Sequence, residues 1–134
     1  MASEILPWLF VGNWQEAQTL SRDEWVTFTC AHDSPFKGTF FYPMRDGADC
    51  PPNLIDEAAQ QIKDAEPFLN GRKILVHCMS GFSRSPAVVV RYLCMTGMTF
   101  NDAVKLVESK RPIMIENNPN QGLRDLVKKL CESA

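Results

Sequence analysis

A nine-residue segment near the middle of the chain combines a cysteine, an arginine and small side chains in a spacing that suits phosphate chemistry. Successive backbone N–H groups in a turn that opens a helix can point into one concavity, and the positive end of the helix dipole strengthens their attraction for an anion. Arg84 adds a planar guanidinium that can bind two phosphate oxygens, and Gly81 allows backbone torsions that other residues resist. The segment is His77-Cys78-Met79-Ser80-Gly81-Phe82-Ser83-Arg84-Ser85, and we predict that residues Met79 to Arg84 bind phosphate.

Cys78 lies at the predicted mouth of this loop, where the field that holds a phosphate also favours a thiolate. A thiolate beside a bound phosphorus can attack it and form a covalent intermediate. Ser85 can donate a hydrogen bond to the sulfur when that intermediate breaks down, and we expect His77 to orient the loop through hydrogen bonds. A cysteine before a helix is usually a small buried side chain, but the complete string makes that interpretation the weaker one.

The elements that must position the loop are a buried strand before it and a buried helix after it. Ile74-Leu75-Val76 is a short apolar run typical of a strand covered on both faces. Ser85-Pro86 opens an apolar segment that continues to Met95, and we predict a helix there because proline suits the first helical turn. Further strands are predicted over 8–11, 25–30 and 39–42, and further helices over 15–20, from a cap at Asn53 to Leu69, from Thr99 to before Pro112, and after Pro119. This order predicts helices packed on a small, mostly parallel sheet, in an α/β or α+β fold.

Composition and charge favour a soluble globular protein. The chain has 134 residues and a formal net charge of −2, and its basic residues are scattered. Its apolar runs fall short of the roughly 20 residues that a membrane span needs, and its first residues do not resemble a signal peptide. Five widely spaced cysteines lack metal-ligand spacing and suggest reduced thiols. We therefore expect a cytoplasmic monomer, with a nuclear location also allowed, that uses no metal and has neither nucleic acid nor a membrane as its partner.

The string H-C-x-x-G-x-S-R-S resembles the loop of dual-specificity phosphatases, which belong to the cysteine-based protein tyrosine phosphatases. The similarity covers nearly the whole chain and is strongest over residues 72–112, where Arg91-Tyr92-Leu93 and Arg111-Pro112 resemble features of the family's next two helices. It implies that residues 1–134 form a single minimal catalytic domain, an α/β fold with a central, mostly parallel sheet of four to five strands flanked by helices. It also implies hydrolysis of phosphotyrosine, phosphoserine and phosphothreonine in proteins through a cysteinyl-phosphate at Cys78, without a cofactor.

Asp46 is the predicted general acid. The leaving oxygen needs a proton, and both Asp46 and Asp49 lie on a Gly- and Pro-rich loop over 44–52. Family members place the acid on a loop well before the cysteine, at a spacing that Asp46, 32 residues upstream of Cys78, fits better than Asp49, 29 residues upstream. The run from Asp46 to Pro52 also resembles the acid loop of regenerating-liver and kinase-associated phosphatases. Asp49 stays open as the alternative. We also hypothesise that Cys50, on the same loop, can form a disulfide with an oxidised Cys78.

Several other functions use a similar loop. An RNA 5′-triphosphatase would need a basic channel around the site, and the net negative charge of this chain argues against one. A phospho-binding module without turnover typically lacks the cysteine or the arginine, and this chain keeps both. A rhodanese-like sulfurtransferase would not need Asp46 or the Ser-Arg-Ser ending. Inositol-lipid phosphatases usually carry basic residues inside the loop, whereas residues 79–83 contain no lysine.

Overall fold

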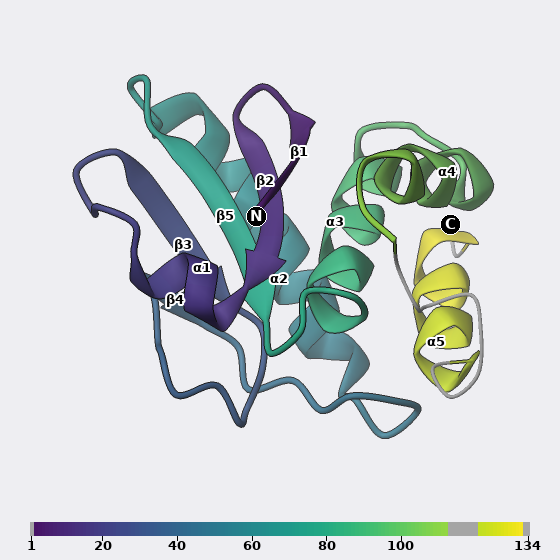
Figure 1. Cartoon of the computed structure of the whole chain (residues 1–134). Helices are drawn as coiled ribbons and strands as arrows, with labels where there is room; N and C mark the ends of the chain where they lie inside the picture. The colour runs from purple at the N-terminus through teal and green to yellow at the C-terminus, as the bar shows by residue number, and fades with distance from the viewer. Residues whose placement is uncertain (1, 113–120, 133–134) are drawn as a thin grey trace.

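The computed structural model describes residues 2–112 and 121–132. The strands are β1 (Ser3–Leu6), β2 (Leu9–Asn13), β3 (Trp25–Thr29), β4 (Phe40–Phe41) and β5 (Lys73–Cys78). The helices are α1 (Trp14–Gln18), α2 (Pro52–Ala65), the short 3₁₀ turn η1 (Glu66–Phe68), α3 (Arg84–Met95), α4 (Phe100–Lys110) and α5 (Gln121–Glu132). A five-stranded sheet in the order β1-β2-β5-β3-β4 forms the centre, with α1 in front of it and α2 behind it in Figure 1. Helix α3 contacts β2 and β5, and α2, α4 and α5 pack against α3.

Strand β5 is the centre of the sheet and carries Cys78 at its carboxyl end. It runs parallel to β2 on one side and to β3 on the other, with Val76 opposite both Val11 and Phe28. All of its residues except Lys73 are buried, as expected for a strand covered on both faces. In the part of the chain that the structure describes, β1 is the one strand that runs antiparallel to its neighbour. The predicted mostly parallel sheet with flanking helices is therefore confirmed, and its carboxyl edge is where the site lies.

The helix that follows the loop is confirmed as a buried helix. Helix α3 contains Pro86 in its first turn, and most of its residues are buried because they lie between the sheet and three other helices. The predicted start of α4 is also confirmed, since the Thr99 side chain accepts a hydrogen bond from the Asp102 backbone N–H at 3.1 Å. Among the described residues, no helix has the length and apolar character needed to span a membrane.

The predicted cap of α2 is wrong. The helix begins at Pro52, with Pro51 as the residue before it, so Asn53 lies inside the first turn. Proline is well placed at the first helical position because its missing N–H has no partner there. The other end lies before the predicted one at Leu69, since α2 stops at Ala65 and gives way to η1, which contains Pro67. The predicted helix start near Pro119 lies outside the described residues, and α5 is described from Gln121.

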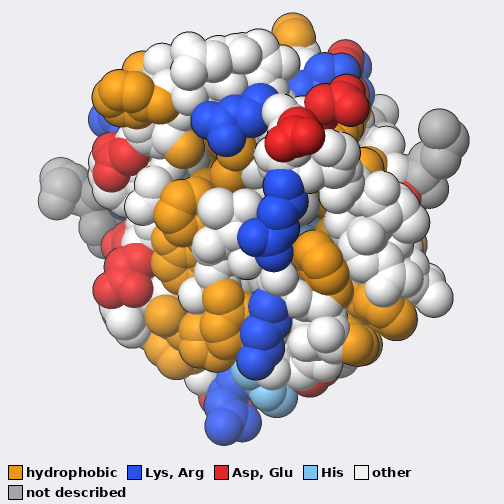
Figure 2. Space-filling view, turned by 90° about the vertical axis from the view of Figure 1, so that its left-hand side faces the viewer, with side chains coloured by type: hydrophobic (Ala, Val, Ile, Leu, Met, Phe, Trp, Pro, Cys, Tyr) orange, Lys and Arg blue, Asp and Glu red, His pale blue; other side chains and the backbone are white. Residues whose placement is uncertain are grey.

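Basic side chains lie over aromatic rings both next to the β4 edge of the sheet and at the start of the central strand β5. The Lys37 ammonium lies 4.9 Å from the centre of the Phe41 ring, and that of Lys73 lies 5.7 Å from the centre of the Trp25 ring. Figure 2, which faces the left-hand side of Figure 1, shows basic and hydrophobic side chains intermingled on this face. Lys37 lies shortly before the edge strand β4, where a charged side chain discourages pairing with another chain.

Candidate active site

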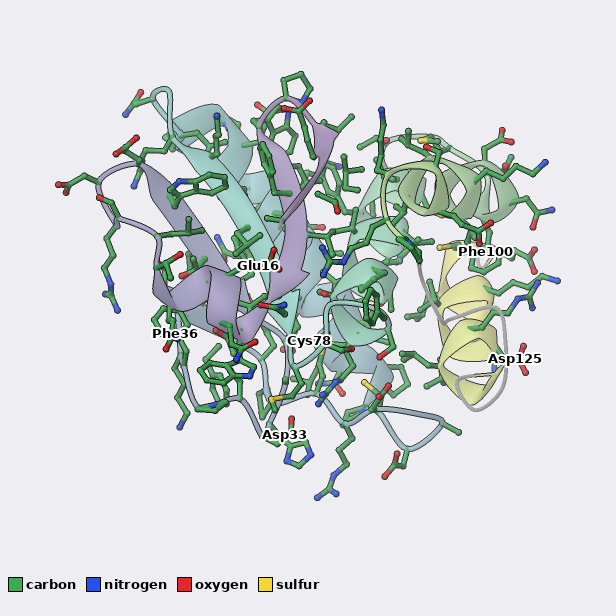
Figure 3. The ribbon with its side chains drawn as sticks, in the orientation of Figure 1. Glu16, Asp33, Phe36, Cys78, Phe100 and Asp125 are labelled. Carbon is green, nitrogen blue, oxygen red and sulfur yellow. The ribbon has the colours of Figure 1, made fainter. Side chains whose placement is uncertain are left out.

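The loop between β5 and α3 depends on a glycine. Gly81 has a φ of +80°, a region that glycine enters without a steric penalty. A Cβ at this position would lie 2.6 Å from the carbonyl oxygen of Gly12 and 2.7 Å from Nη2 of Arg111. Backbone conformation and close packing therefore both require glycine here. Figure 3 labels Cys78 where the loop leaves the sheet.

The other loop residues fall where the sequence predicts, between the strand and the first turn of the helix. The carbonyl of Met79 accepts a hydrogen bond from the backbone N–H of Trp14 at 3.4 Å. Ser80 accepts one from the backbone N–H of Phe82 at 3.3 Å, and the Phe82 ring is partly exposed. Ser83 is buried at the N-cap of α3. The loop is thus attached through Met79 to the start of α1.

The Cys78 sulfur lies between two hydrogen-bond donors. Its Sγ is 3.3 Å from the Ser85 hydroxyl oxygen and 3.3 Å from the backbone nitrogen of Gly81, which donates to it. Ser85 is fully buried in the first turn of α3, so the sulfur also lies at the positive end of that helix. These surroundings stabilise negative charge on sulfur.

Arg84 connects the loop to two other segments. Its Nη1 donates to Asp33 Oδ1 at 2.9 Å and to the Met44 carbonyl at 3.1 Å. Its Nε is buried and has no hydrogen-bond partner among the described residues. A buried donor without a partner is costly, and a phosphate oxygen is the type of acceptor that a guanidinium binds best.

Sequence reasoning missed Asp33. It lies on the loop after β3, and its side chain is about half exposed although it pairs with the buried Arg84. Burial acts to raise the pKa of Asp33, but the hydrogen bond and the charge of Arg84 outweigh that effect and lower the pKa. Asp33 is therefore ionised at neutral pH. The parallel arrangement of β3 and β5 could have identified it, because residues that follow parallel strands meet at one edge of the sheet.

His77 is held by a chain of hydrogen bonds. Its Nδ1 lies 3.2 Å from the Cys78 carbonyl oxygen, which can only accept, so Nδ1 carries the proton. Burial lowers the pKa of His77, which is therefore neutral. Nε2 then accepts from the Thr29 hydroxyl at 2.7 Å, and that hydroxyl oxygen accepts from the Gly38 N–H at 2.8 Å. The imidazole fixes the backbone at Cys78 to the neighbouring strand.

The two candidate acids lie on the loop between β4 and α2. Asp46 and Asp49 are both exposed. The Met44 carbonyl, two residues before Asp46, is the acceptor for Arg84, so this loop is fixed to the site close to Asp46. The structure brings Cys78, Ser85, His77 and Arg84 together. Among the described residues, neither the Asp46 nor the Asp49 carboxylate makes a contact that would identify it as the acid.

Two further buried thiols, Cys30 and Cys50, lie on segments around the site. Thr29 is paired with His77 across the parallel strands, and the Cys30 N–H donates to the His77 carbonyl at 2.8 Å, so Cys30, the residue directly after β3, lies beside Cys78. Burial, followed by the charges of Cys78 and Cys50, raises the pKa of Cys30 well above its usual value. Burial likewise raises the pKa of Cys50 to about 11. Within residues 2–112 and 121–132, no cluster of His, Cys, Asp and Glu has the size to hold a metal ion.

Three features together define a cysteine-dependent phosphatase site. Cys78 lies at the end of a parallel strand, its sulfur is hydrogen-bonded to the first turn of the next helix, and Arg84 follows it at the end of the loop. Residues 25–128 match the family model described as "Dual specificity phosphatase, catalytic domain". The chain belongs to the dual specificity phosphatase family. The expectation drawn from the loop sequence is confirmed.

Known relatives agree with this assignment. The chain is 36% identical over 135 residues to MAP kinase phosphatase with leucine-rich repeats protein 3 of Dictyostelium discoideum, covering 92% of this chain and 15% of that protein. It is 31% identical over 133 residues to dual specificity protein phosphatase 15 of Rattus norvegicus, covering 91% of this chain and 54% of that protein. The chain thus spans about half or less of the length of these relatives. The crystal structure of human DUSP28 matches with a TM-score of 0.82 at 23% identity, covering 98% of this chain and 93% of that one, which supports the fold.

Proposed function

We propose that this chain is a catalytic domain that hydrolyses phosphotyrosine, phosphoserine and phosphothreonine monoesters in proteins. The observation that carries the proposal is the position of the Cys78 sulfur, 3.3 Å from both the Ser85 hydroxyl and the Gly81 N–H, beside the buried guanidinium of Arg84. A sulfur in this position lies next to the groups that would bind a phosphate and can act as the nucleophile.

The proposed reaction has two steps. The loop N–H groups and Arg84 bind the phosphate, the Cys78 thiolate attacks phosphorus, and the P–O bond breaks while Asp46 protonates the leaving oxygen. Water then attacks the cysteinyl-phosphate, Asp46 takes the proton from that water, and the S–P bond breaks. Ser85 donates to the departing sulfur in this second step. The chain's own residues supply every group, without a metal or a cofactor.

The substrate class follows from the charges near the site. Asp33, Asp46 and Asp49 are exposed on the two loops that contact Arg84, and the net charge of the chain is −2. These carboxylates disfavour a polyanion such as an RNA 5′-triphosphate more than a single phosphomonoester on a protein. The same charge balance supports the proposal that nucleic acid is not a partner. The free, widely spaced cysteines support a reducing location, cytoplasmic or also nuclear. We also propose that the chain is a monomer without a membrane partner.

The test is a substrate panel. Phosphate release should be measured from phosphotyrosine, phosphoserine and phosphothreonine peptides and from an RNA with a labelled 5′-triphosphate, using wild type and Cys78→Ser. We expect release from the peptides by wild type alone. Release only from the RNA would replace the proposed substrate class, and phosphopeptide binding without any turnover would indicate a binding module.

A further inference from the structure

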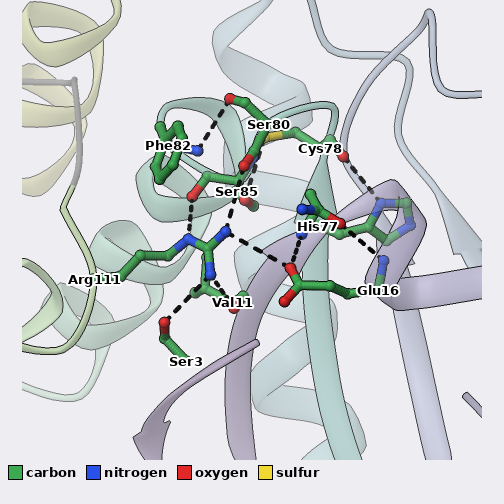
Figure 4. Close-up of polar contacts among 11 residues, drawn as sticks. Ser3, Val11, Glu16, His77, Cys78, Ser80, Phe82, Ser85 and Arg111 are labelled. Atoms are coloured by element: carbon green, nitrogen blue, oxygen red, sulfur yellow. Dashed lines mark hydrogen bonds and ion pairs between the residues drawn. The ribbon is translucent and has the colours of Figure 1, made fainter. Parts of the chain in front are cut away.

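Arg111 lies far from the phosphate loop in sequence but directly beneath it in the structure. It is the C-cap residue that directly follows α4, and it is only 7% exposed. Figure 4 shows its guanidinium reaching from α4 to the outer side of the loop, opposite the Cys78 sulfur. Nothing in the two-step reaction uses this buried cation.

The guanidinium binds two successive carbonyls of the loop. Its Nε donates to the Gly81 carbonyl at 2.9 Å, and its Nη2 lies 3.4 Å from the Ser80 carbonyl as a second donor. A loop that binds an anion through its N–H groups must turn its carbonyls outward, where they need donors of their own because a buried carbonyl without one is costly. Arg111 supplies these donors from a rigid, planar group.

Other contacts fix the guanidinium itself. Its Nη1 donates to the Ser3 hydroxyl at 3.3 Å and to the Val11 carbonyl at 3.4 Å, which connects it to β1 and β2. Glu16 Oε1 lies 3.7 Å from Nη2, and the same oxygen accepts from the Asn13 backbone N–H at 2.8 Å in the capping box of α1. The Arg111 charge is therefore balanced locally, so its contribution to the loop is geometric.

The contact extends to the exposed side of the loop. The Arg111 guanidinium carbon lies 5.2 Å from the centre of the Phe82 ring, a cation–π distance. One side chain thus contacts three consecutive residues, Ser80, Gly81 and Phe82, on the side away from the sulfur.

From this geometry we infer that Arg111 is a positioning residue, which holds the loop carbonyls outward and thereby keeps the loop N–H groups aimed at the phosphate. The inference deepens the proposed function and rests on the same loop. A positioning role differs from a purely structural one in its prediction. Variants that lack the Arg111 guanidinium should bind phosphate more weakly even when they are correctly folded.

The experiment measures the affinity for inorganic phosphate in two ways. The first is competitive inhibition of p-nitrophenyl phosphate hydrolysis, and the second is calorimetry. The variants are Arg111→Met and Arg111→Lys. Lys110→Met is the matched control, since it removes an exposed cation at the same end of α4. Val104→Ala is the stability control, since it removes buried volume where α4 packs into the hydrophobic core. An inhibition constant does not depend on the fraction of active molecules, so lost stability alone leaves it unchanged.

For Arg111→Met we expect the inhibition constant of phosphate and the KM to rise by about tenfold or more, while Lys110→Met and Val104→Ala keep wild-type values. Arg111→Lys should retain most of this defect, because an ammonium cannot replace the two-donor contact. Wild-type phosphate affinity in either Arg111 variant would overturn the inference. So would failure of both to fold while Val104→Ala folds, which would assign Arg111 to stability alone. Failure of the proposed substrate class is a separate result, because it would appear as inactive wild type on phosphopeptides with phosphate binding intact.

Discussion

Replacing Ser85 with alanine removes one of the two hydrogen-bond donors that lie beside the Cys78 sulfur. The Ser85 hydroxyl is 3.3 Å from Sγ and fully buried, so water cannot readily take its place. A hydrogen bond to a charged group is worth about 1.5–3 kcal/mol. At about 1.4 kcal/mol per factor of ten, its loss should slow the step in which the thiolate departs by roughly 10- to 150-fold.

The assay is stopped-flow hydrolysis of p-nitrophenyl phosphate. Ser85→Ala should release about one equivalent of nitrophenol per site in a fast burst and then turn over slowly, because the phosphoenzyme accumulates. The value of kcat should fall far more than kcat/KM, which reports only the steps up to cleavage of the P–O bond. Ser109→Ala, on the exposed face of α4, is the matched control. An unchanged kcat, or an equal fall in both constants without a burst, would refute this role of Ser85.

Three further predictions concern the acid, the buried histidine and the neighbouring thiol. Asp46→Asn should lower kcat on phosphoserine peptides by roughly 10²–10⁴ and on aryl phosphates by less, and an equal loss in Asp49→Asn would reverse the assignment. Burial lowers the pKa of His77, so only the unfolded chain gains a proton as pH falls below about 6.5. The stabilisation that comes from neutral His77 should therefore be complete above that pH and decrease below it. In His77→Gln, the denaturant midpoint should change less between about pH 7 and pH 5 than it does in wild type. An equal change of the midpoint with pH in both proteins would contradict this. Limited peroxide should oxidise Cys78 to a sulfenic acid, which the thiol of Cys30 attacks with release of water. Neighbouring parallel strands lie about 4.8 Å apart, within the Cα separation that a disulfide spans. Peptide mapping should find this disulfide and recovery with dithiothreitol, whereas a Cys78 link to Cys50 would favour the loop thiol.

The phosphate loop could be predicted from sequence because its chemistry is local. Cys78, Gly81, Arg84 and Ser85 lie within eight consecutive residues, and the strand and helix around them have clear apolar patterns. The start of α2 could not be placed as well, because Asn53 and the two prolines before it are competing helix-start signals and the prolines prevailed.

The supporting residues could not be identified from local patterns. Asp33 contacts Arg84 across 51 residues, and Arg111 contacts Gly81 across 30 residues and Ser3 across 108. Such contacts depend on which strands are neighbours and on where a helix ends in space, and residue spacing does not encode either. Arg111 entered the sequence analysis only through the family resemblance.

The most direct test of the proposed mechanism is to identify the phosphorylated residue during turnover. Ser85→Ala enzyme, in which the intermediate should accumulate, is mixed with p-nitrophenyl phosphate, quenched in denaturant within the burst phase and mapped by peptide mass spectrometry. We predict one phosphate per molecule, on the Cys78 sulfur, and none when Cys78 is replaced by serine. Phosphate on any other residue, or full turnover by Cys78→Ser, would contradict the assignment of Cys78 as the nucleophile.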